Sequence, residues 1–451
     1  MNFFKVKNIR IKEEKQAQKY HATIQETDEC TQKPKEHLFR ILLLTNRDSD
    51  NVGDQVIETC DLSLLSAVME NLGVTNYAID SCAASIAAVK ENAASPSIPE
   101  GASLQIAQSD LIVYGGAPMF NYLYQPFYQR TAMVLEAAEQ FHKPVIFSAV
   151  GIESYDEDNP KCQRIKNALQ FSCVKQITTR DDFVSLKKYR EDETIPLAKV
   201  ADPAVFSFSV FRNFIKPPKK RQKKKIGLFI LRENAFLDNH IDLSGEDAAI
   251  FWKGLIRELI HRGYRCELLT SGHFSDESFM DYLIRAYGVK SKRCFFHMDS
   301  PERLVGKIAK YDAIVSCRLH PSIISYSLEI PSLGIIWNPK VASFYQSIGY
   351  ADRAIEAKDL TPTHVADRLE RIMEEGVVCD SNYQTSVYSS LFYGIKSILR
   401  PNDDTIQPYS YEELMHRLPP FPGTSQAELE EKTRRKLRRI YHSYNNLTHG
   451  R

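Results

Sequence analysis

The chain lacks the cysteine patterns that would commit it to a special class of protein. Its nine cysteines form no CxxC pair and show no Cys/His spacing typical of metal ligands. The count is odd, and residues such as Cys317 lie inside apolar runs, which is typical of a reducing compartment. The cysteines therefore argue against a disulfide-stapled secreted domain, and we expect neither a metal centre nor a redox cofactor.

Long apolar segments and a strong net charge are missing as well. The N-terminal stretch MNFFKVKNIRIKEEKQ lacks the apolar core of a signal peptide. No stretch approaches the roughly 18 uninterrupted apolar residues that cross a bilayer. The formal net charge is +1, so the whole molecule carries no strong field toward nucleic acid or a membrane. We therefore expect a cytoplasmic protein with no nucleic-acid partner.

What the 451 residues do contain is an alternation of short apolar runs and helical patterns, in two series over residues 39–216 and 226–376. Between them, PPKKRQKKK at 217–225 is too basic for a core and is predicted to be a linker. Residues 1–38 are polar and weakly periodic and are predicted to be an extension. Strands that alternate with helices predict an α/β fold, with two doubly wound parallel sheets facing a cleft. The predicted strands are 40–45, 76–80, 110–116, 144–151, 176–181, 226–231, 264–271, 293–298, 313–318 and 331–336.

The last part of the chain, residues 377–451, departs from this alternation. It contains a helical pattern that begins with a capping box at Ser425 and Glu428 and is mostly basic from Lys432 to Arg439. Such a helix either contacts anionic lipid at the inner face of a membrane or packs on its own protein with a solvated basic face, and we favour the second. Its apolar face would contain Leu429, Leu437, Ile440, Tyr444 and Leu447.

A polar loop, TNRDSDNVGDQVIE, joins the first predicted strand to a helix. Gly53 permits backbone geometry that other residues resist, as a tight strand-to-helix turn requires. Asn51 or Asp54 can cap the helix, or can face an anion or a sugar hydroxyl at the helix N-terminus. Both interpretations stay open from this motif alone.

Two further motifs follow strands of the first series. In DLIVYGGAPMF, Gly115 and Gly116 either let a ligand approach closely or make a plain turn. In QITTRDDF, Arg180 comes just after a strand. Its guanidinium either points to the open strand ends or pairs with a neighbouring carboxylate.

The strongest pattern lies in the second series. The strand AIVSC is followed by Arg318 and His320, and the next strand is followed by WNPK with Lys340. Two cations and a histidine at adjacent strand ends predict an anion site. Histidine can donate or accept a proton near neutral pH. We therefore favour a functional role here over a histidine that is merely satisfied in a core.

Taken together, these motifs resemble the polysaccharide pyruvyl transferase family. The matching segments, in the family's order, are NVGDQVI (51–57), DLIVYGGAPMF (110–120), VIFSAVGI (145–152), TTRDDFVS (178–185), VADPAV (200–205) and DAIVSCRLHPSIIS (312–325), followed by IPSLGIIWNPK (330–340). The resemblance covers residues 38–350 and leaves both ends of the chain without a counterpart. The chain has Ala117 where the family often has a third glycine, and Pro321 where a small residue is more common, which bears on the acceptor rather than on the fold.

The resemblance implies a GT-B-like fold, with an acceptor-binding first domain and a donor-binding second domain. It implies transfer from phosphoenolpyruvate to a sugar of a bacterial-type polysaccharide, such as an exopolysaccharide, or of its lipid-linked or nucleotide-linked precursor. The product would be a pyruvate ketal that bridges two hydroxyls. The family's donor-binding positions fall on Arg180, Arg318 and His320, with Lys340 as a weaker correspondence.

These implied roles can be assigned residue by residue. We expect Arg180, Arg318 and Lys340 to hold the donor, His320 to protonate it and Asp54 to accept a hydroxyl proton. The acceptor would be contacted by Asn51, Gly115 and Gly116. Two alternatives remain: a nucleotide-sugar-dependent glycosyltransferase, which would share the cleft, and a non-catalytic scaffold of a polysaccharide assembly complex, which the basic tail favours slightly.

Overall fold

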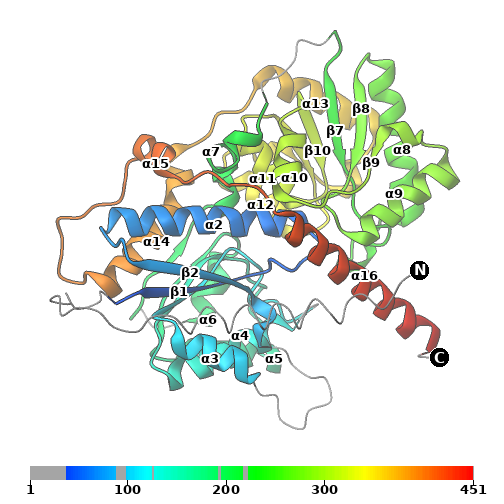
Figure 1. Ribbon diagram of the computed structural model, residues 1–451. Helices are drawn as coiled ribbons and strands as arrows, with labels where there is room; N and C mark the ends of the chain where they lie inside the picture. Colours follow the sequence, from blue (N-terminus) through cyan, green and yellow to red (C-terminus); the bar gives the residue numbers. More distant parts are fainter. Residues whose placement is uncertain (1–36, 88–97, 124–125, 191–193, 217–221, 450–451) are drawn as a thin grey trace, which may run out of the picture. The chain divides into compact units, whose positions relative to one another are not determined.

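The computed structural model describes residues 37–87, 98–123, 126–190, 194–216 and 222–449. The predicted extension at 1–38 therefore lies almost entirely outside the described residues, and so does most of the predicted linker. From Phe39 onward the chain forms one compact unit. This unit contains two parallel six-stranded sheets (Figure 1).

The first sheet has the strand order β2-β1-β3-β4-β5-β6. Its strands are β1 (Phe39–Thr45), β2 (Tyr77–Ala83), β3 (Leu111–Tyr114), β4 (Val145–Val150), β5 (Val174–Thr179) and β6 (Leu197–Lys199). Its helices are α2 (Val52–Asn71), α3 (Glu100–Gln108), α4 (Phe127–Gln140), α5 (Pro160–Leu169) and α6 (Phe183–Tyr189), and the short α7 (Ser207–Val210) follows the sheet.

The second sheet has the order β12-β11-β10-β7-β8-β9. Its strands are β7 (Lys225–Phe229), β8 (Arg265–Leu269), β9 (Cys294–Phe295), β10 (Ala313–Ser316), β11 (Ser332–Ile335) and β12 (Ala354–Ile355). Its helices are α8 (Gly245–His261), α9 (Phe274–Tyr287), α10 (Pro301–Ile308), α11 (Leu319–Ser327), α12 (Pro339–Ser347) and α13 (Pro362–Glu375).

Each sheet therefore reverses its winding direction at one place. In the first sheet β1 lies between β2 and β3, and in the second β7 lies between β8 and β10. At such a switch point the loops after the two neighbouring strands leave in opposite directions and open a crevice. The loops after β1 and β10 carry the most distinctive sequence motifs, so both motifs stand at switch points.

The structure confirms every predicted strand, with shifted ends. The two strands that the sequence did not indicate, β6 and β12, are edge strands of three and two residues. Strands this short carry too few residues for an alternating pattern to be recognised. The domain boundaries predicted after residues 38, 216, 225 and 376 stay predictions.

Helix α2 lies between the two sheets (Figure 1). It is buried along nearly its whole length, including polar positions such as Asp54 and Asp61. Its apolar residues belong to a core cluster that also contains Ile41 of β1 and Ile323 of α11. One continuous core thus reaches from the first sheet to the second. This packing brings the beginning of α2 against the helix that follows β10.

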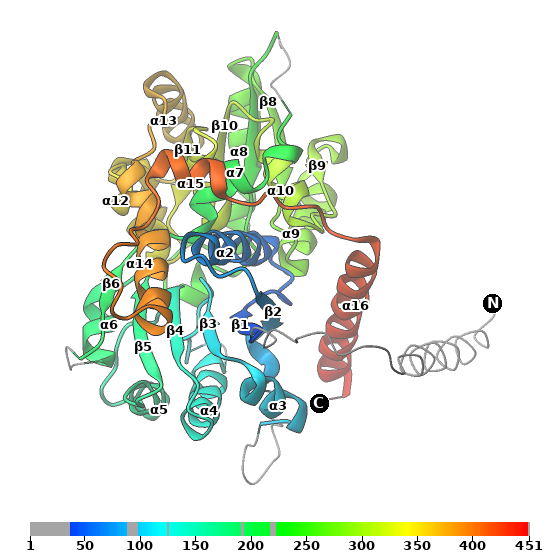
Figure 2. The same cartoon turned by 60° about the vertical axis from the view of Figure 1, so that its left-hand side comes forward.

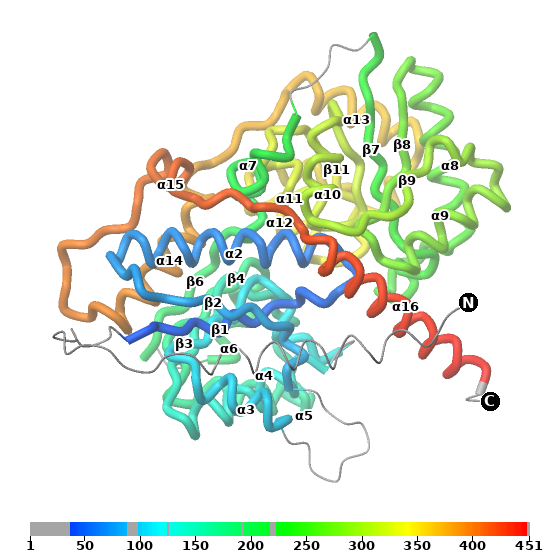
Figure 3. The backbone as a smooth tube through the Cα atoms, in the orientation of Figure 1, coloured from blue at the N-terminus to red at the C-terminus, as the bar shows by residue number. Residues whose placement is uncertain are grey.

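After α13 the chain returns to the first half, as the smooth tube in Figure 3 shows. Helix α14 (Ser381–Leu399) packs on α2, β4 and β5, and the Gln176 side chain of β5 donates a hydrogen bond to Ser390. Two more helices follow, α15 (Tyr411–Arg417) and α16 (Gln426–His449). No helix among the described residues is long and apolar enough to span a membrane.

Helix α16 begins with the predicted capping box. The Ser425 hydroxyl accepts a hydrogen bond from the Glu428 backbone, and the Ser425 backbone donates to the Glu428 carboxylate at 2.9 Å. The helix packs on its own protein, as favoured, but its basic face is not solvated throughout, because Lys436 forms an ion pair with Glu277 of α9. Of the predicted apolar face, Leu429, Leu437 and Ile440 line a cavity beside inward-facing basic residues, whereas Leu447 is 76% exposed.

Candidate active site between the two sheets

A cavity of about 320 Å³ lies where the carboxyl ends of the two sheets face each other. The first half contributes loops after β1, β3, β4 and β5, and the second contributes loops after β7, β8, β10 and β11. The lining residues are Asn46, Ser49, Asn51, Asp54, Pro118, Asn121, Glu153, Arg180, Leu231, Arg232, Asp238, Asn239, His273, Arg318, Leu319, His320, Trp337, Asn338, Lys340 and Val341.

Most of the predicted site residues meet in this cavity. It is lined by Asn51, Asp54 and Arg180 from the first half and by Arg318, His320 and Lys340 from the second. These residues are far apart in the sequence, so only the packing of the two halves brings them together.

The predicted acceptor residues Gly115 and Gly116 have another neighbour. The backbone N–H of Gly116 donates to the buried Asp61 carboxylate of α2, and a Cβ on Gly115 would stand 2.2 Å from the same carboxylate oxygen. The glycines therefore make room for Asp61. Within this segment Pro118 is the residue that lines the cavity. Contact of Gly115 or Gly116 with an acceptor stays a prediction.

Arg180 extends from the end of β5 and is almost fully buried. Its guanidinium forms an ion pair with Asp202 and lies 3.8 Å from the Asp181 carboxylate. Asp202 in turn caps the turn that follows it, because its other oxygen accepts a hydrogen bond from the Ala204 backbone. Both interpretations of Arg180 from the sequence therefore hold, since the side chain is paired and also lines the cavity.

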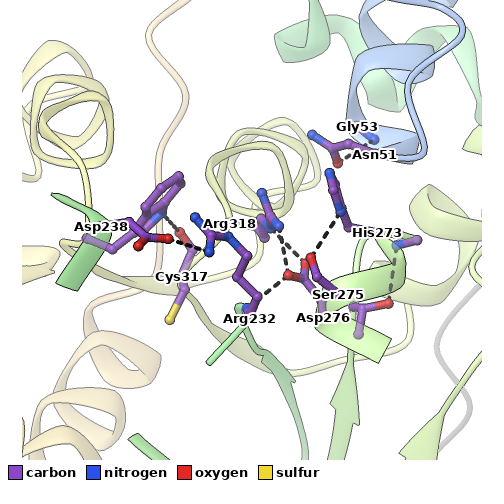
Figure 4. A network of polar contacts seen from close by, with 12 residues as sticks. Asn51, Gly53, Arg232, Asp238, His273, Ser275, Asp276, Cys317 and Arg318 are labelled. Carbon is purple, nitrogen blue, oxygen red and sulfur yellow. Dashed lines mark hydrogen bonds and ion pairs between the residues drawn. The ribbon is translucent and has the colours of Figure 1, made fainter. Parts of the chain in front are cut away.

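Arg318 is held by a two-pronged ion pair on the opposite side of the cavity. Its Nε and one terminal nitrogen each donate to Asp276 at 2.8 Å, and Asp276 is fully buried (Figure 4). The same carboxylate accepts a bond from the backbone of Arg232, whose side chain pairs with Asp238. A bidentate pair with a buried partner fixes both the position and the orientation of the guanidinium.

Helix α11 starts directly after Arg318, which occupies its N-cap position without a side-chain cap. The first backbone N–H groups of an α-helix have no partner within the helix, and they carry partial positive charge. Leu319 and His320, the first two residues of α11, line the cavity. The cavity thus receives positive potential from Arg318 and from this helix end together.

The His320 ring packs directly on the beginning of α2. A Cβ on Gly53 would stand 2.3 Å from the ring Nδ1, so no other residue fits at this position without a shift. Gly53 lies in the first turn of α2 and not among the residues with positive φ. The expectation that Gly53 serves an unusual backbone conformation is therefore wrong, and the close approach of His320 explains it instead.

Asn51 determines which ring nitrogen of neutral His320 carries the proton. As the N-cap of α2, Asn51 accepts a hydrogen bond from the Gly53 backbone through its side-chain oxygen. Its amide nitrogen then stands 3.3 Å from Nδ1 of His320 and must donate, so Nδ1 accepts. The proton of the neutral ring therefore lies on Nε2, which is buried and has no hydrogen-bond partner among the described residues.

Asp54 stands opposite this nitrogen, with Oδ1 at 3.8 Å from His320 Nε2. Burial raises the pKa of Asp54 to about 6, although hydrogen bonds from Ser49 and Asn46 oppose the shift. Burial, together with the nearby positive charges of Arg180 and Arg318, lowers the pKa of His320 well below its usual value. At neutral pH His320 is therefore a neutral imidazole, and Asp54 exchanges its proton near pH 6.

Lys340 and Glu153 face each other across the cavity. Lys340 lies in the first turn of α12, and its ammonium group is 3.8 Å from the Glu153 carboxylate. Glu153 follows β4 and accepts a hydrogen bond from Asn121 at 2.8 Å. Sequence reasoning missed Glu153, although its place one residue after the segment VIFSAVGI and past a buried strand was a usable signal.

Asp276, the buried partner of Arg318, and Arg232 were also missed. Asp276 lies within helix α9 and far from any recognisable motif, so no local signal indicated it. Arg232 shortly follows β7 and could have been identified as a polar residue at a strand end. Among the described residues, no group of three or more His, Cys, Asp or Glu side chains is arranged to hold a metal ion.

Comparison with known proteins now adds to this geometry. The chain matches the model of the polysaccharide pyruvyl transferase family over residues 12–339. It belongs to this family. The match begins at residue 12, inside the N-terminal segment for which the sequence analysis found no counterpart. The C-terminal helices α13 to α16 lie beyond it.

Solved structures with similar folds belong to other enzymes. A UDP-N-acetylglucosamine 2-epimerase is 10% identical, with a TM-score of 0.53 over 83% of this chain and 98% of that one. The UDP-GlcNAc 2-epimerase of Methanocaldococcus jannaschii is 11% identical, with a TM-score of 0.50 over 78% of this chain and 97% of that one. At such low identity the likeness shows the fold alone, two Rossmann-like halves in a GT-B-like arrangement. Among curated proteins, none matches this chain.

Proposed function

We propose that this pyruvyl transferase family member joins the pyruvyl group of phosphoenolpyruvate to two hydroxyls of one sugar, forming a ketal and releasing phosphate. The observation that carries the proposal is the convergence of Arg180, Arg318, Lys340 and His320 on one cavity between the two sheets. Phosphoenolpyruvate carries a carboxylate and a phosphate, and a site with fixed cations on two sides suits such a molecule. Membership of the family supports the same donor.

The donor would lie against the second half of the site. Arg318 and the N-terminus of α11 offer a fixed positive patch, which suits a phosphate or carboxylate group. Lys340 offers a mobile point charge beside it. Arg180 closes the pocket from the first half, where its buried pair with Asp202 holds it in place.

Donor binding would also favour protonation of the His320 imidazole. Burial and the positive charges of Arg180, Arg318 and Lys340 keep the pKa of this imidazole low before the donor binds. A bound trianion neutralises these charges, so the pKa of His320 rises. Nε2 already carries a proton, so the added proton enters at Nδ1, and the Asn51 side chain must then present its oxygen to the ring. Asp54, whose pKa is about 6, stands 3.8 Å from Nε2 and can return a proton to this nitrogen after it has been transferred.

Protonated His320 then acts as the general acid. Its Nε2 proton moves to the methylene carbon of phosphoenolpyruvate, which becomes a methyl group and leaves the central carbon electrophilic. The oxygen of a first sugar hydroxyl bonds to this carbon, and its proton goes to the Asp54 carboxylate. No step of this scheme requires a metal or a redox cofactor.

A second hydroxyl of the same sugar closes the ketal. Its oxygen bonds to the central carbon as the bond from that carbon to the phosphate oxygen breaks. Glu153, oriented by Asn121, is the second carboxylate of the cavity and is suited to receive this proton and pass it to the departing phosphate. The protons balance, because two leave the hydroxyls, one enters the methyl group and one leaves with phosphate.

The proposal is tested by incubating the protein with phosphoenolpyruvate and candidate sugars, free, lipid-linked or nucleotide-linked. Phosphate release and a pyruvate ketal on the sugar, detected by mass spectrometry, are expected. Thermal shift with phosphoenolpyruvate alone tests donor binding without knowledge of the acceptor. A shift with nucleotide-sugars but none with millimolar phosphoenolpyruvate would instead indicate a glycosyltransferase, and no shift with either would favour a scaffold.

A further inference from the structure

The C-terminal helix α16 lies beyond the residues matched by the family model, and it contacts the loop that borders the candidate active site. Figure 2 shows it along one side of the two halves, separate from the helices that cover the sheets. The chain is anchored just before the helix, where the Thr424 hydroxyl donates to Glu302 of α10 at 2.9 Å. Basic residues of α16 make further contacts with the rest of the protein, beside Leu429, Leu437 and Ile440, which line a cavity there.

These basic residues divide into an inner and an outer set. The inner residues bind other parts of the protein: Lys432 donates to Gln55, Arg435 pairs with Asp48, Lys436 pairs with Glu277, and Arg439 pairs with Asp50 and donates to the Asp48 carbonyl. The outer residues Arg434 and Arg438 are about 60% exposed and, within the part of the chain that the structure describes, form ion pairs with Glu430 and Glu431 of the same helix alone.

Two residues of the inner set, Arg435 and Arg439, bind the loop between β1 and α2. Asp48 and Asp50 of this loop line a second cavity of about 280 Å³ together with α16. Asn46 and Asn51 of the same loop face the active-site cavity, and Ser49 borders both cavities. The loop therefore separates the two cavities, with α16 on one side and the proposed active site on the other.

The end of the same loop, where α2 begins, is held in place by the second half of the protein. The Val52 backbone N–H donates to the Ser271 carbonyl at 2.7 Å. Gly272 has φ +96°, and a Cβ there would stand 2.7 Å from the Asp50 carbonyl. Lys436 of α16 donates to the Gly272 carbonyl as well. The loop is thus held between α16 and the loop after β8, next to Asn51.

We propose that Arg435 and Arg439 are positioning residues that hold the 46–51 loop in place and, through Asn51, set the proton position on His320. Arg439 binds the residue directly before Asn51, and Asn51 donates to Nδ1 of His320. The catalytic consequence rests on the proposed function, whereas the ordering of the loop does not.

The expected signature is a large loss of activity with a small loss of stability. Arg435 and Arg439 are 27% and 46% exposed, and ion pairs this accessible to water contribute little to folding. A displacement of about 1 Å at a catalytic group, however, can lower the rate by about 100-fold. A merely structural helix would change both quantities together.

The experiment compares the double variant R435A/R439A with the matched double variant R434A/R438A, both in the full chain. For R435A/R439A we expect faster amide hydrogen exchange in residues 46–54, a fall in kcat of about tenfold or more and little change in Tm. For R434A/R438A we expect exchange and kcat close to those of the original protein. Unchanged exchange and unchanged kcat in R435A/R439A would overturn the proposal.

A charge swap supplies the second arm and does not depend on either double variant folding well. R439D alone should speed exchange in the 46–54 loop, and R439D/D50R should slow it again by restoring the pair. Unchanged exchange in R439D, or faster exchange in R439D that the swap does not reverse, would also overturn the proposal. If phosphoenolpyruvate fails to bind even the original protein, the proposed function fails, but the hydrogen-exchange comparison still decides the role of α16.

Discussion

The two halves of the cavity differ in whether their charged groups change protonation near neutral pH. In the second half, Arg318 is locked to a fully buried carboxylate and stands at a helix N-terminus, so its positive charge does not move. In the first half, Asp54 has a pKa raised by burial to about 6, so its charge changes within the working pH range. His320 comes from the second half but packs on the first, directly against α2. The comparison indicates a half with a fixed positive charge and a proton-exchanging half that meet at one histidine.

The largest effect is expected at this meeting point. His320→Ala removes the proposed general acid, and general acid catalysis contributes about 10²–10⁴-fold in rate. Turnover, measured as phosphate release, should fall by that amount while far-UV circular dichroism and donor-induced thermal shift are retained. The control is His142→Ala, which changes an exposed histidine that does not line the cavity. Near-normal turnover in the His320 variant would reject the role.

The fixed half is tested by comparing two cations. Arg318→Ala leaves the buried Asp276 carboxylate without its partner, and the loss of one partner of such a pair lowers stability by about 3–5 kcal/mol. Lys340→Ala removes a partly exposed charge whose partner Glu153 is 3.8 Å away, so its stability should hardly change. Both variants should bind phosphoenolpyruvate more weakly by calorimetry, but only Arg318→Ala should also lower the free energy of unfolding. Equal stability of the two variants would contradict the locked pair.

The proton-exchanging half is tested by pH. The folded-state pKa of Asp54 is raised from 3.8 to about 6, so the native state binds the extra proton, and stability falls as pH rises through this window. By linkage the fall amounts to roughly 3 kcal/mol for a shift of this size. Asp54→Asn should therefore gain stability relative to the original protein between pH 4 and pH 7.

Urea unfolding at both pH values measures this difference directly. Asp48→Asn is the matched control, because Asp48 lies on the loop just before α2 but faces α16. A constant stability difference between the Asp54 variant and the original protein across the pH range would argue against a raised pKa.

The smallest effect is expected at Glu153. Glu153→Gln removes the proposed second proton acceptor but keeps the hydrogen-bonding shape beside Asn121. Phosphate can still take the proton directly, so turnover should fall by only about tenfold, near the low end of general base catalysis. Donor affinity should rise slightly, because Lys340 loses its acidic neighbour. Weaker donor binding in this variant would show that Glu153 instead positions Lys340.

Sequence reasoning reached most of the site because strand ends carry their own signals. Arg318 and His320 follow a buried apolar strand, and parallel strands bring their carboxyl ends to one edge of the sheet. Asp276 could not be found in this way, since it sits in a helix and acts only through a contact with Arg318 across the fold. Gly53 and Gly115 were recognised as special but for the wrong or an incomplete reason, because close approach by a distant side chain leaves no local pattern.

The amino-acid sequence by itself determined the two α/β halves, the positions of their long strands along the chain and the positions where polar residues follow these strands. These features could be predicted because hydrophobic periodicity and turn chemistry are local properties. Only the tertiary structure decided that α2 stands between the halves and that Asn51 faces His320. It also decided that the basic side of α16 turns inward. These outcomes depend on which charged and apolar surfaces meet after folding, and that balance is set by contacts between residues hundreds of positions apart.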